Sequence, residues 1–83
     1  MICTIVGYEN IQYVNKDNRQ VKGLRLYYQY EDDSITGKAC DTVYVSADSP
    51  AYIEKPELNR KYDFNYQHSG FTGKTRLVSI KAI

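Results

Sequence analysis

Catalytic motifs are the first chemistry to test for, and the strongest candidate is Gly73-Lys74-Thr75, which is similar to the end of a phosphate-binding loop. The full pattern requires glycine at position 68, where His68 stands, and a following helix, where residues 76–83 alternate like a strand. His68 is the only histidine, and it has no acid–serine or acid–cysteine companion in a recognised motif. We therefore expect a protein that is not an enzyme and has no small-molecule substrate.

Metal and redox sites are equally poorly supported. Cys3 and Cys40 are too few for a metal cage, and Asp32-Asp33 lacks the further oxygen ligands that a cation requires. We expect no metal and no cofactor. The first seven residues lack the basic and apolar regions of a signal peptide, and no segment approaches the roughly 20 apolar residues that cross a bilayer. A cytoplasmic protein with reduced thiols and no membrane partner is predicted, with one disulfide left as an alternative.

Basic and aromatic side chains form a second candidate set. Single-stranded nucleic acid is bound by cations that follow the phosphates and by flat rings on which bases stack. The chain has nine tyrosines and no tryptophan. Tyrosine also fits the pleated, half-buried surface of a sheet, so both explanations stay open. The residues that we expect to bind nucleic acid are Lys16, Arg19, Lys22, Arg25, Tyr27, Tyr44, Phe71, Lys74 and Arg76.

Charge is nearly balanced overall but unevenly distributed. The net charge of +1 argues against a strongly basic, salt-driven binder. Residues 1–30 hold four basic and two acidic residues, residues 31–57 two basic and seven acidic, and residues 58–83 five basic and one acidic. A basic groove forms only if the fold brings the first and last segments together.

The elements that must position these residues are strands, because hydrophobic side chains recur with a period of two. Leu24, Leu26, Tyr28 and Tyr30 alternate with more polar residues, and residues 60–67 repeat the pattern. We expect five strands, at about 1–14, 24–31, 38–46, 60–67 and 75–82, with a bulge or bend at Gly7. No long amphipathic helix is expected.

Turn residues set the connections between these strands. Residues 15–23 form a polar, basic loop, residues 32–37 close a second hairpin, and residues 69–73 close a third. The stretch 47–59 is the one long link, where Ser49 and Pro50 could start a short helical turn. This plan predicts a single domain over residues 1–83, an all-β five-stranded Greek-key barrel of the OB-fold type, with an SH3-like barrel as the alternative. Closure would also remove exposed strand edges.

Alternation also assigns faces. If Leu24, Leu26 and the valines of the third strand face the core, then Arg25, Tyr27 and Tyr44 face outward. The aromatic residues expected in the core are Tyr28, Tyr30, Tyr62, Phe64 and Tyr66, with at most one of the last three reaching a ligand or partner. The outer face, the first loop and the last hairpin are where an OB barrel receives oligonucleotides.

Several short segments resemble the small single-stranded-DNA-binding, or helix-destabilising, proteins of filamentous phages. The likeness covers Val43-Tyr44-Val45, Ser49-Pro50-Ala51-Tyr52, Phe71-Thr72-Gly73 and Arg76-Leu77-Val78, and more weakly Lys16 to Gly23. The resemblance implies an OB-fold homodimer that coats single strands cooperatively. By similarity, Lys16, Arg19 and Lys22 would hold phosphates, Tyr27 and Tyr44 would stack bases, and Phe71 would act near the neighbouring subunit.

Two functions remain open at this point. The first is a phage or mobile-element protein that coats single-stranded nucleic acid, DNA rather than RNA, during replication. The second is a small inhibitor or adaptor that contacts a protein through the acidic segment from Glu31 to Glu57.

Overall fold

Five strands form the described part of the chain, which comprises residues 1–68, 70, 73 and 75–83 of a computed structural model. The strands are β1 (Ile2–Val14), β2 (Gln20–Glu31), β3 (Lys38–Ser46), β4 (Arg60–His68) and β5 (Thr75–Ala82). No helix occurs in these residues, so none is long and apolar enough to cross a membrane. The predicted all-β class and all five strands are confirmed.

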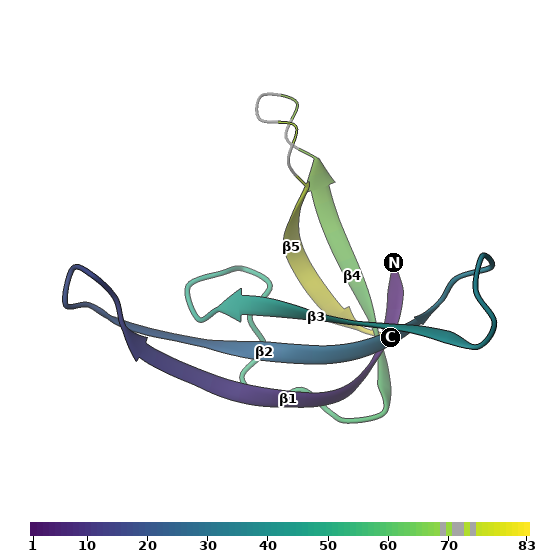
Figure 1. The fold of residues 1–83 in the computed structure, drawn as a ribbon, viewed down its shortest axis with the longest axis horizontal. Helices are drawn as coiled ribbons and strands as arrows, with labels where there is room; N and C mark the ends of the chain where they lie inside the picture. The colour runs from purple at the N-terminus through teal and green to yellow at the C-terminus, as the bar shows by residue number, and fades with distance from the viewer. Residues whose placement is uncertain (69, 71–72, 74) are drawn as a thin grey trace.

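All five strands belong to one antiparallel sheet in the order β3-β2-β1-β4-β5. β3 and β5 are its two edges, and no ladder joins them in the described residues. Figure 1 shows the β4–β5 hairpin rising across the layer formed by β1, β2 and β3. The predicted closure into a barrel is therefore not observed: the sheet folds over, but β3 and β5 do not pair in the described residues.

The β1–β2 hairpin extends far beyond the rest of the sheet. β1 pairs with β4 only over residues 2–5, but with β2 as far as Val14 and Gln20. The ladder therefore includes residues 20–23, which were expected in a loop. Gln20 and Lys22 continue the face of Leu24 and Leu26 but are exposed, because the core ends at Leu24, so the sequence here lacks the hydrophobic alternation that marks a strand. The projecting part, residues 9–25, is called the wing below.

A bulge at Gly7 divides β1 into its two parts, as predicted. The register with β2 shifts between Ile5, which lies opposite Tyr28, and Gly7, which lies opposite Tyr27. The extra residue changes which side chains face outward, because side chains alternate strictly along a strand. Before the bulge Thr4 lies on the outer face opposite Gln29, and after the bulge Glu9 lies on the same face opposite Arg25.

The core is small and lies on the inner face of the folded sheet. Its centre is Phe64, whose side chain is fully buried and whose ring lies 5.0 Å from that of Tyr28. The predicted inward positions of Leu24, Leu26, Tyr28, Tyr62 and Phe64 are confirmed. Tyr30 packs partly against them, whereas Tyr66 is 40% exposed.

The link from Ala47 to Asn59 closes the core without a helix. The Oγ of Ser49 accepts a hydrogen bond from the backbone N–H of Ala51 at 3.1 Å, so Ser49 does organise a turn, but the expected helical turn does not form. Ala51 is buried. The backbone N–H of Glu57 donates to the hydroxyl of Tyr62 at 2.9 Å, which fixes the end of the link to β4.

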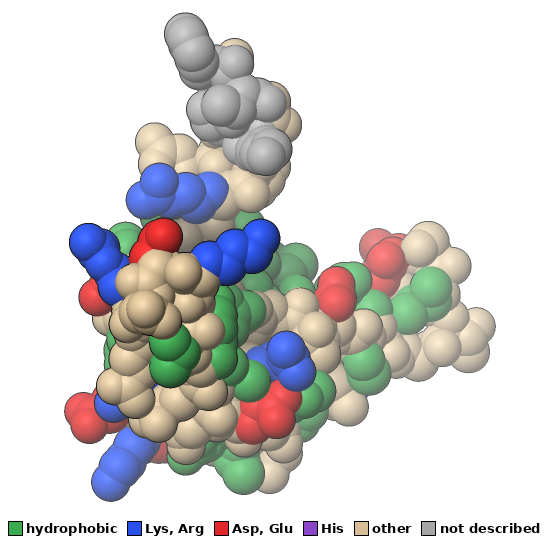
Figure 2. All heavy atoms as spheres, turned by 60° about the vertical axis from the view of Figure 1, so that its left-hand side comes forward, with side chains coloured by type: hydrophobic (Ala, Val, Ile, Leu, Met, Phe, Trp, Pro, Cys, Tyr) green, Lys and Arg blue, Asp and Glu red, His purple; other side chains and the backbone are tan. Residues whose placement is uncertain are grey.

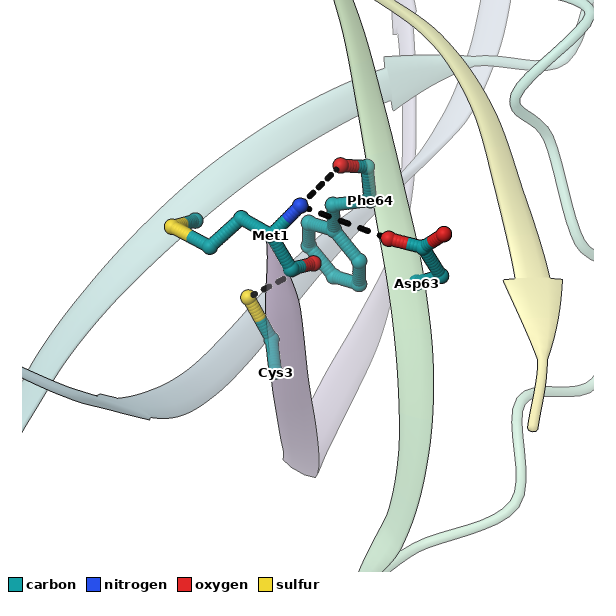
Figure 3. A network of polar contacts seen from close by, with 4 residues as sticks. All are labelled: Met1, Cys3, Asp63 and Phe64. Atoms are coloured by element: carbon teal, nitrogen blue, oxygen red, sulfur yellow. Dashed lines mark hydrogen bonds and ion pairs between the residues drawn. The ribbon is translucent and has the colours of Figure 1, made fainter.

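The start of β1 is joined to β4 by polar contacts. The amino group of Met1 donates to the carbonyl oxygen of Phe64 at 2.9 Å and lies 3.3 Å from the carboxylate of Asp63 (Figure 3). Cys3 is buried beneath these contacts, whereas Cys40 is exposed, and both thiols are free. Burial raises the pKa of Cys3, so this thiol is poorly reactive.

Candidate nucleic-acid interface

The tip of the wing is a short turn organised by Asn15. The Oδ1 of Asn15 accepts hydrogen bonds from the backbone N–H groups of Asp17 and Arg19, both at 3.0 Å. Asn18 adopts a left-handed conformation with φ 59°, which asparagine tolerates better than most residues. The turn places Lys16 in solvent at the tip and starts β2 just after Arg19.

A first hollow lies between the wing and the end of β3. It has a volume of about 300 Å³, and Arg19 and Lys22 line it opposite Ser46, Ala47 and Asp48. The backbone N–H of Ala47 donates to the carbonyl oxygen of Lys22 at 2.9 Å, which holds the two sides together. The position of Lys22 is thus fixed by the ladder rather than by a loop.

A second hollow adjoins the first and lies in the gap between β3 and β5. Its volume is about 540 Å³, and it shares Ser46 and Asp48 with the first hollow. Tyr44 lines it from β3, while Tyr66 and Arg76 line it from β4 and β5. The two hollows are called the trough below; the residues of the trough used in the argument are Arg19, Lys22, Tyr44, Asp48, Tyr66 and Arg76.

Tyr44 connects the trough to the outer face of the sheet. It lies opposite Arg25 in the ladder, and its ring packs over Gly23. A Cβ at Gly23 would lie 2.6 Å from the Tyr44 hydroxyl oxygen and 2.5 Å from the carbonyl oxygen of Val45, so only glycine leaves room for this ring. Partial burial, with smaller contributions from Tyr13 and Asp48, raises the pKa of Tyr44.

Arg25 and Tyr27 lie outside the trough and share one acidic partner. The guanidinium of Arg25 donates to Oε1 of Glu9 at 2.9 Å, and the hydroxyl of Tyr27 donates to the same oxygen at 2.8 Å. All three side chains are exposed on the outer face. Their hydrogen-bonding capacity is therefore partly used within the protein.

The charges around the trough are predominantly basic. Figure 2 shows Lys and Arg side chains around the wing and below the grey residues, with acidic side chains beside some of them. Among the described residues, Arg19, Lys22 and Arg76 form no ion pair, in contrast to Arg25 and Arg60. Asp48 is the one carboxylate that lines the trough.

The structure thus brings together part of the predicted set. Arg19, Lys22, Tyr44 and Arg76 line the trough, Arg25 and Tyr27 lie on the adjoining outer face, and Lys16 stands at the wing tip. Tyr27 and Tyr44 face outward as expected. The predicted contacts Phe71 and Lys74 lie outside the described residues.

Three residues near these positions were missed. Tyr66 was assigned to the core, but a register shift between Asn65 and Tyr66 accompanies its exposure to the trough. Tyr13 is 50% exposed on the wing near Tyr44, and Glu9 occupies the outer face beside Arg25. The bulge at Gly7 was the available signal for Glu9 and Tyr13, because it determines which side of β1 faces outward.

Within the described ranges no three His, Cys, Asp or Glu side chains are placed to hold a metal ion. The trough offers cations, hydroxyls and rings, which can bind a polyanion that carries flat groups.

Comparison of the chain with protein-family models, with curated protein sequences and with solved structures finds no match.

Proposed function

We propose that this protein binds single-stranded nucleic acid along the trough and the adjoining face of β2 and β3. The single observation that supports this most strongly is that the two hollows share Ser46 and Asp48 and so adjoin each other. One is lined by Arg19 and Lys22 from one end of the chain, and the other by Arg76 from the other end. Segments of like charge that are distant in sequence thereby form one basic path.

The mechanism is electrostatic capture followed by stacking. Arg19, Lys22 and Arg76 would neutralise successive phosphates, and counterion release would supply much of the binding free energy. Tyr44, held flat over Gly23 and 40% exposed, would stack on a base at little conformational cost. Such binding tolerates any sequence, because every base has a π-face.

The strand order supports an OB-type assignment as part of this proposal. An OB-fold is a five-stranded, partly open Greek-key barrel, and β3-β2-β1-β4-β5 is the order that results when such a barrel opens between β3 and β5. With the resemblance of the short segments described above, this favours a phage-type protein that coats single-stranded DNA in the host cytoplasm as a homodimer.

A charge-matched pair of double variants tests the trough. Lys22→Gln with Arg76→Gln removes two cations from the trough, whereas Lys38→Gln with Lys61→Gln removes two from a separate hollow that shares no residue with it. Fluorescence anisotropy of labelled oligothymidylate at several salt concentrations measures affinity and salt dependence.

The trough variant should bind at least about tenfold more weakly at about 100 mM salt, with a slope of log affinity against log salt reduced by about 1.4. The control should retain the wild-type slope. Equal losses in both variants would mean that overall charge, rather than the trough, determines binding.

A further inference from the structure

Two half-exposed tyrosines face the gap between the edge strands. Tyr44 of β3 and Tyr66 of β4 are each 40% exposed, and both line the same hollow. No ladder crosses this gap in the described residues. The gap therefore holds a hollow of about 540 Å³ where a closed barrel would have backbone hydrogen bonds.

The lining of this gap combines apolar side chains with one cation, Arg76, and one carboxylate, Asp48, among the described residues. Val43, Pro50 and Leu77 contribute hydrophobic surface, and Arg76 stands beside them. A ligand that fits must present a flat or apolar group to the interior and a negative charge to the arginine. A nucleotide of a single strand has both, with its base and its phosphate joined by the sugar.

Both rings contact other parts of the protein in the structure. Tyr44 rests on the backbone at Gly23. Tyr66 lies next to Tyr28, whose own ring is packed against Phe64 at 5.0 Å. A ring that already makes such contacts loses less side-chain entropy on stacking, which favours its use as a binding surface.

We infer that the β3–β5 gap receives one unpaired base, flanked by Tyr44 and Tyr66, while Arg76 contacts its phosphate. This inference rests on the proposed function and extends it, because it names the feature that selects unpaired strands. A base within a duplex is stacked and paired and cannot enter the gap unless it is flipped out.

The test compares oligothymidylate with an abasic oligonucleotide of the same length, which keeps the phosphates and lacks the bases. The proteins are wild type, Tyr66→Leu, Tyr66→Phe and, as a matched control, Tyr30→Leu, whose tyrosine lines the separate hollow. Circular dichroism and thermal melting establish that each variant is folded.

Wild type should prefer the thymidine oligonucleotide. In Tyr66→Leu the ratio of the two affinities should fall by about 5- to 150-fold, whereas Tyr66→Phe should keep the wild-type ratio. For each protein the two oligonucleotides should show the same salt dependence, because both carry the same phosphates. Photocrosslinking of wild type with 5-iodouridine-substituted strands should give adducts at Tyr44 or Tyr66, and this measurement does not depend on a folded variant.

An unchanged base preference in folded Tyr66→Leu, or adducts that avoid both tyrosines, would overturn the inference but leave the proposed function standing. Altered sedimentation of Tyr66→Leu with unchanged base preference would place a second copy of the chain in the gap instead, and would also overturn it. Failure of wild type to bind either oligonucleotide would remove the proposed function itself.

Discussion

Glu9 restrains two of the side chains that the sequence assigns to nucleic-acid binding. Its Oε1 accepts hydrogen bonds from both Arg25 and Tyr27, so the outer face beside the trough carries less positive potential than Arg25 alone would give. A phosphate that approaches Arg25 must compete with this carboxylate. In the proposed function, Glu9 would therefore lower the affinity for a strand at this position.

Glu9→Gln should increase the affinity for oligothymidylate by about two- to fivefold at low salt, because it removes a negative charge beside the strand and releases Arg25. Glu57→Gln, which breaks the exposed pair with Arg60 at the same 2.9 Å distance, is the matched control and should leave affinity nearly unchanged. Anisotropy titrations at about 50 mM salt compare them. An unchanged or weaker affinity of Glu9→Gln would show that Arg25 and Tyr27 do not contact the strand.

Whether an individual side chain points to the core or to the outer face was partly predictable from the sequence. Period-two alternation is enough to place Leu24 and Leu26 inward and Tyr27 and Tyr44 outward, since β2 and β3 are regular over these residues. Glu9 and Tyr66 could not be placed in this way. Glu9 follows the extra residue of β1, which moves every following side chain of that strand to the other face. Tyr66 lies where the register shifts because β5 carries an extra residue, Val78, and the sequence of β4 itself gives no sign of this.

At the scale of elements, the closest approach between β2 and β3 lies at Gly23. The missing side chain allows the ring of Tyr44 to rest on the β2 backbone, next to the carbonyl oxygen of Val45. This contact aligns the wing with the free edge of β3 and so shapes the junction of the two hollows.

Gly23→Ala should lower the free energy of unfolding by about 1–3 kcal/mol, because its Cβ would meet backbone at 2.5 Å and must displace either the strand or the Tyr44 ring. Gly7→Ala is the control, since its Cβ would only touch the Tyr27 ring at 3.8 Å. Urea denaturation measures both. A Gly23→Ala protein as stable as Gly7→Ala would contradict this packing.

The number and order of strands were accessible from the sequence, whereas their closure was not. Turn residues and alternation are local signals, and they placed all five strands close to the observed bounds. Closure depends on how far β1 and β2 bend and on how the 47–59 link fills the space beside β3. Ala51 enters the core there, although no periodic pattern marks it.

At the scale of the molecule, the acidic cluster of the middle segment lies in a different hairpin from the basic residues of the wing. The wing holds all four basic residues of the first segment together with Glu9 and Asp17, whereas the β2–β3 hairpin, which extends in the opposite direction, carries Glu31, Asp32 and Asp33 (Figure 1). Asp32 accepts hydrogen bonds from the hydroxyl and the backbone N–H of Ser34, which lower its pKa and keep it ionised. This separation keeps the acidic cluster of residues 31–33 away from the wing, which carries a net charge of +2 in a chain whose net charge is only +1.

The free energy of unfolding should decrease at alkaline pH. Burial raises the pKa of the Cys3 thiol above its usual range, and burial together with the neighbouring Tyr66 raises the pKa of Tyr28. The unfolded chain therefore ionises first, so these groups leave the free energy of unfolding unaffected below about pH 8. At higher pH each reduces it by up to about 1.4 kcal/mol per pH unit, first Cys3 and then Tyr28.

Urea unfolding at pH 7 to 11 measures this decline. Tyr28→Phe should unfold along a shallower alkaline curve, because it removes one of the two buried groups. An identical pH dependence of Tyr28→Phe and wild type would show that Tyr28 does not contribute.

Titration of the purified protein with oligothymidylate, followed by tyrosine fluorescence and electrophoretic shift, tests the central claim most directly. We expect quenching and a shifted band at micromolar protein in about 50 mM salt. The logarithm of the affinity should fall linearly with the logarithm of the salt concentration, with a slope of about −0.7 for each phosphate neutralised. Absence of both quenching and shift under these conditions would contradict it.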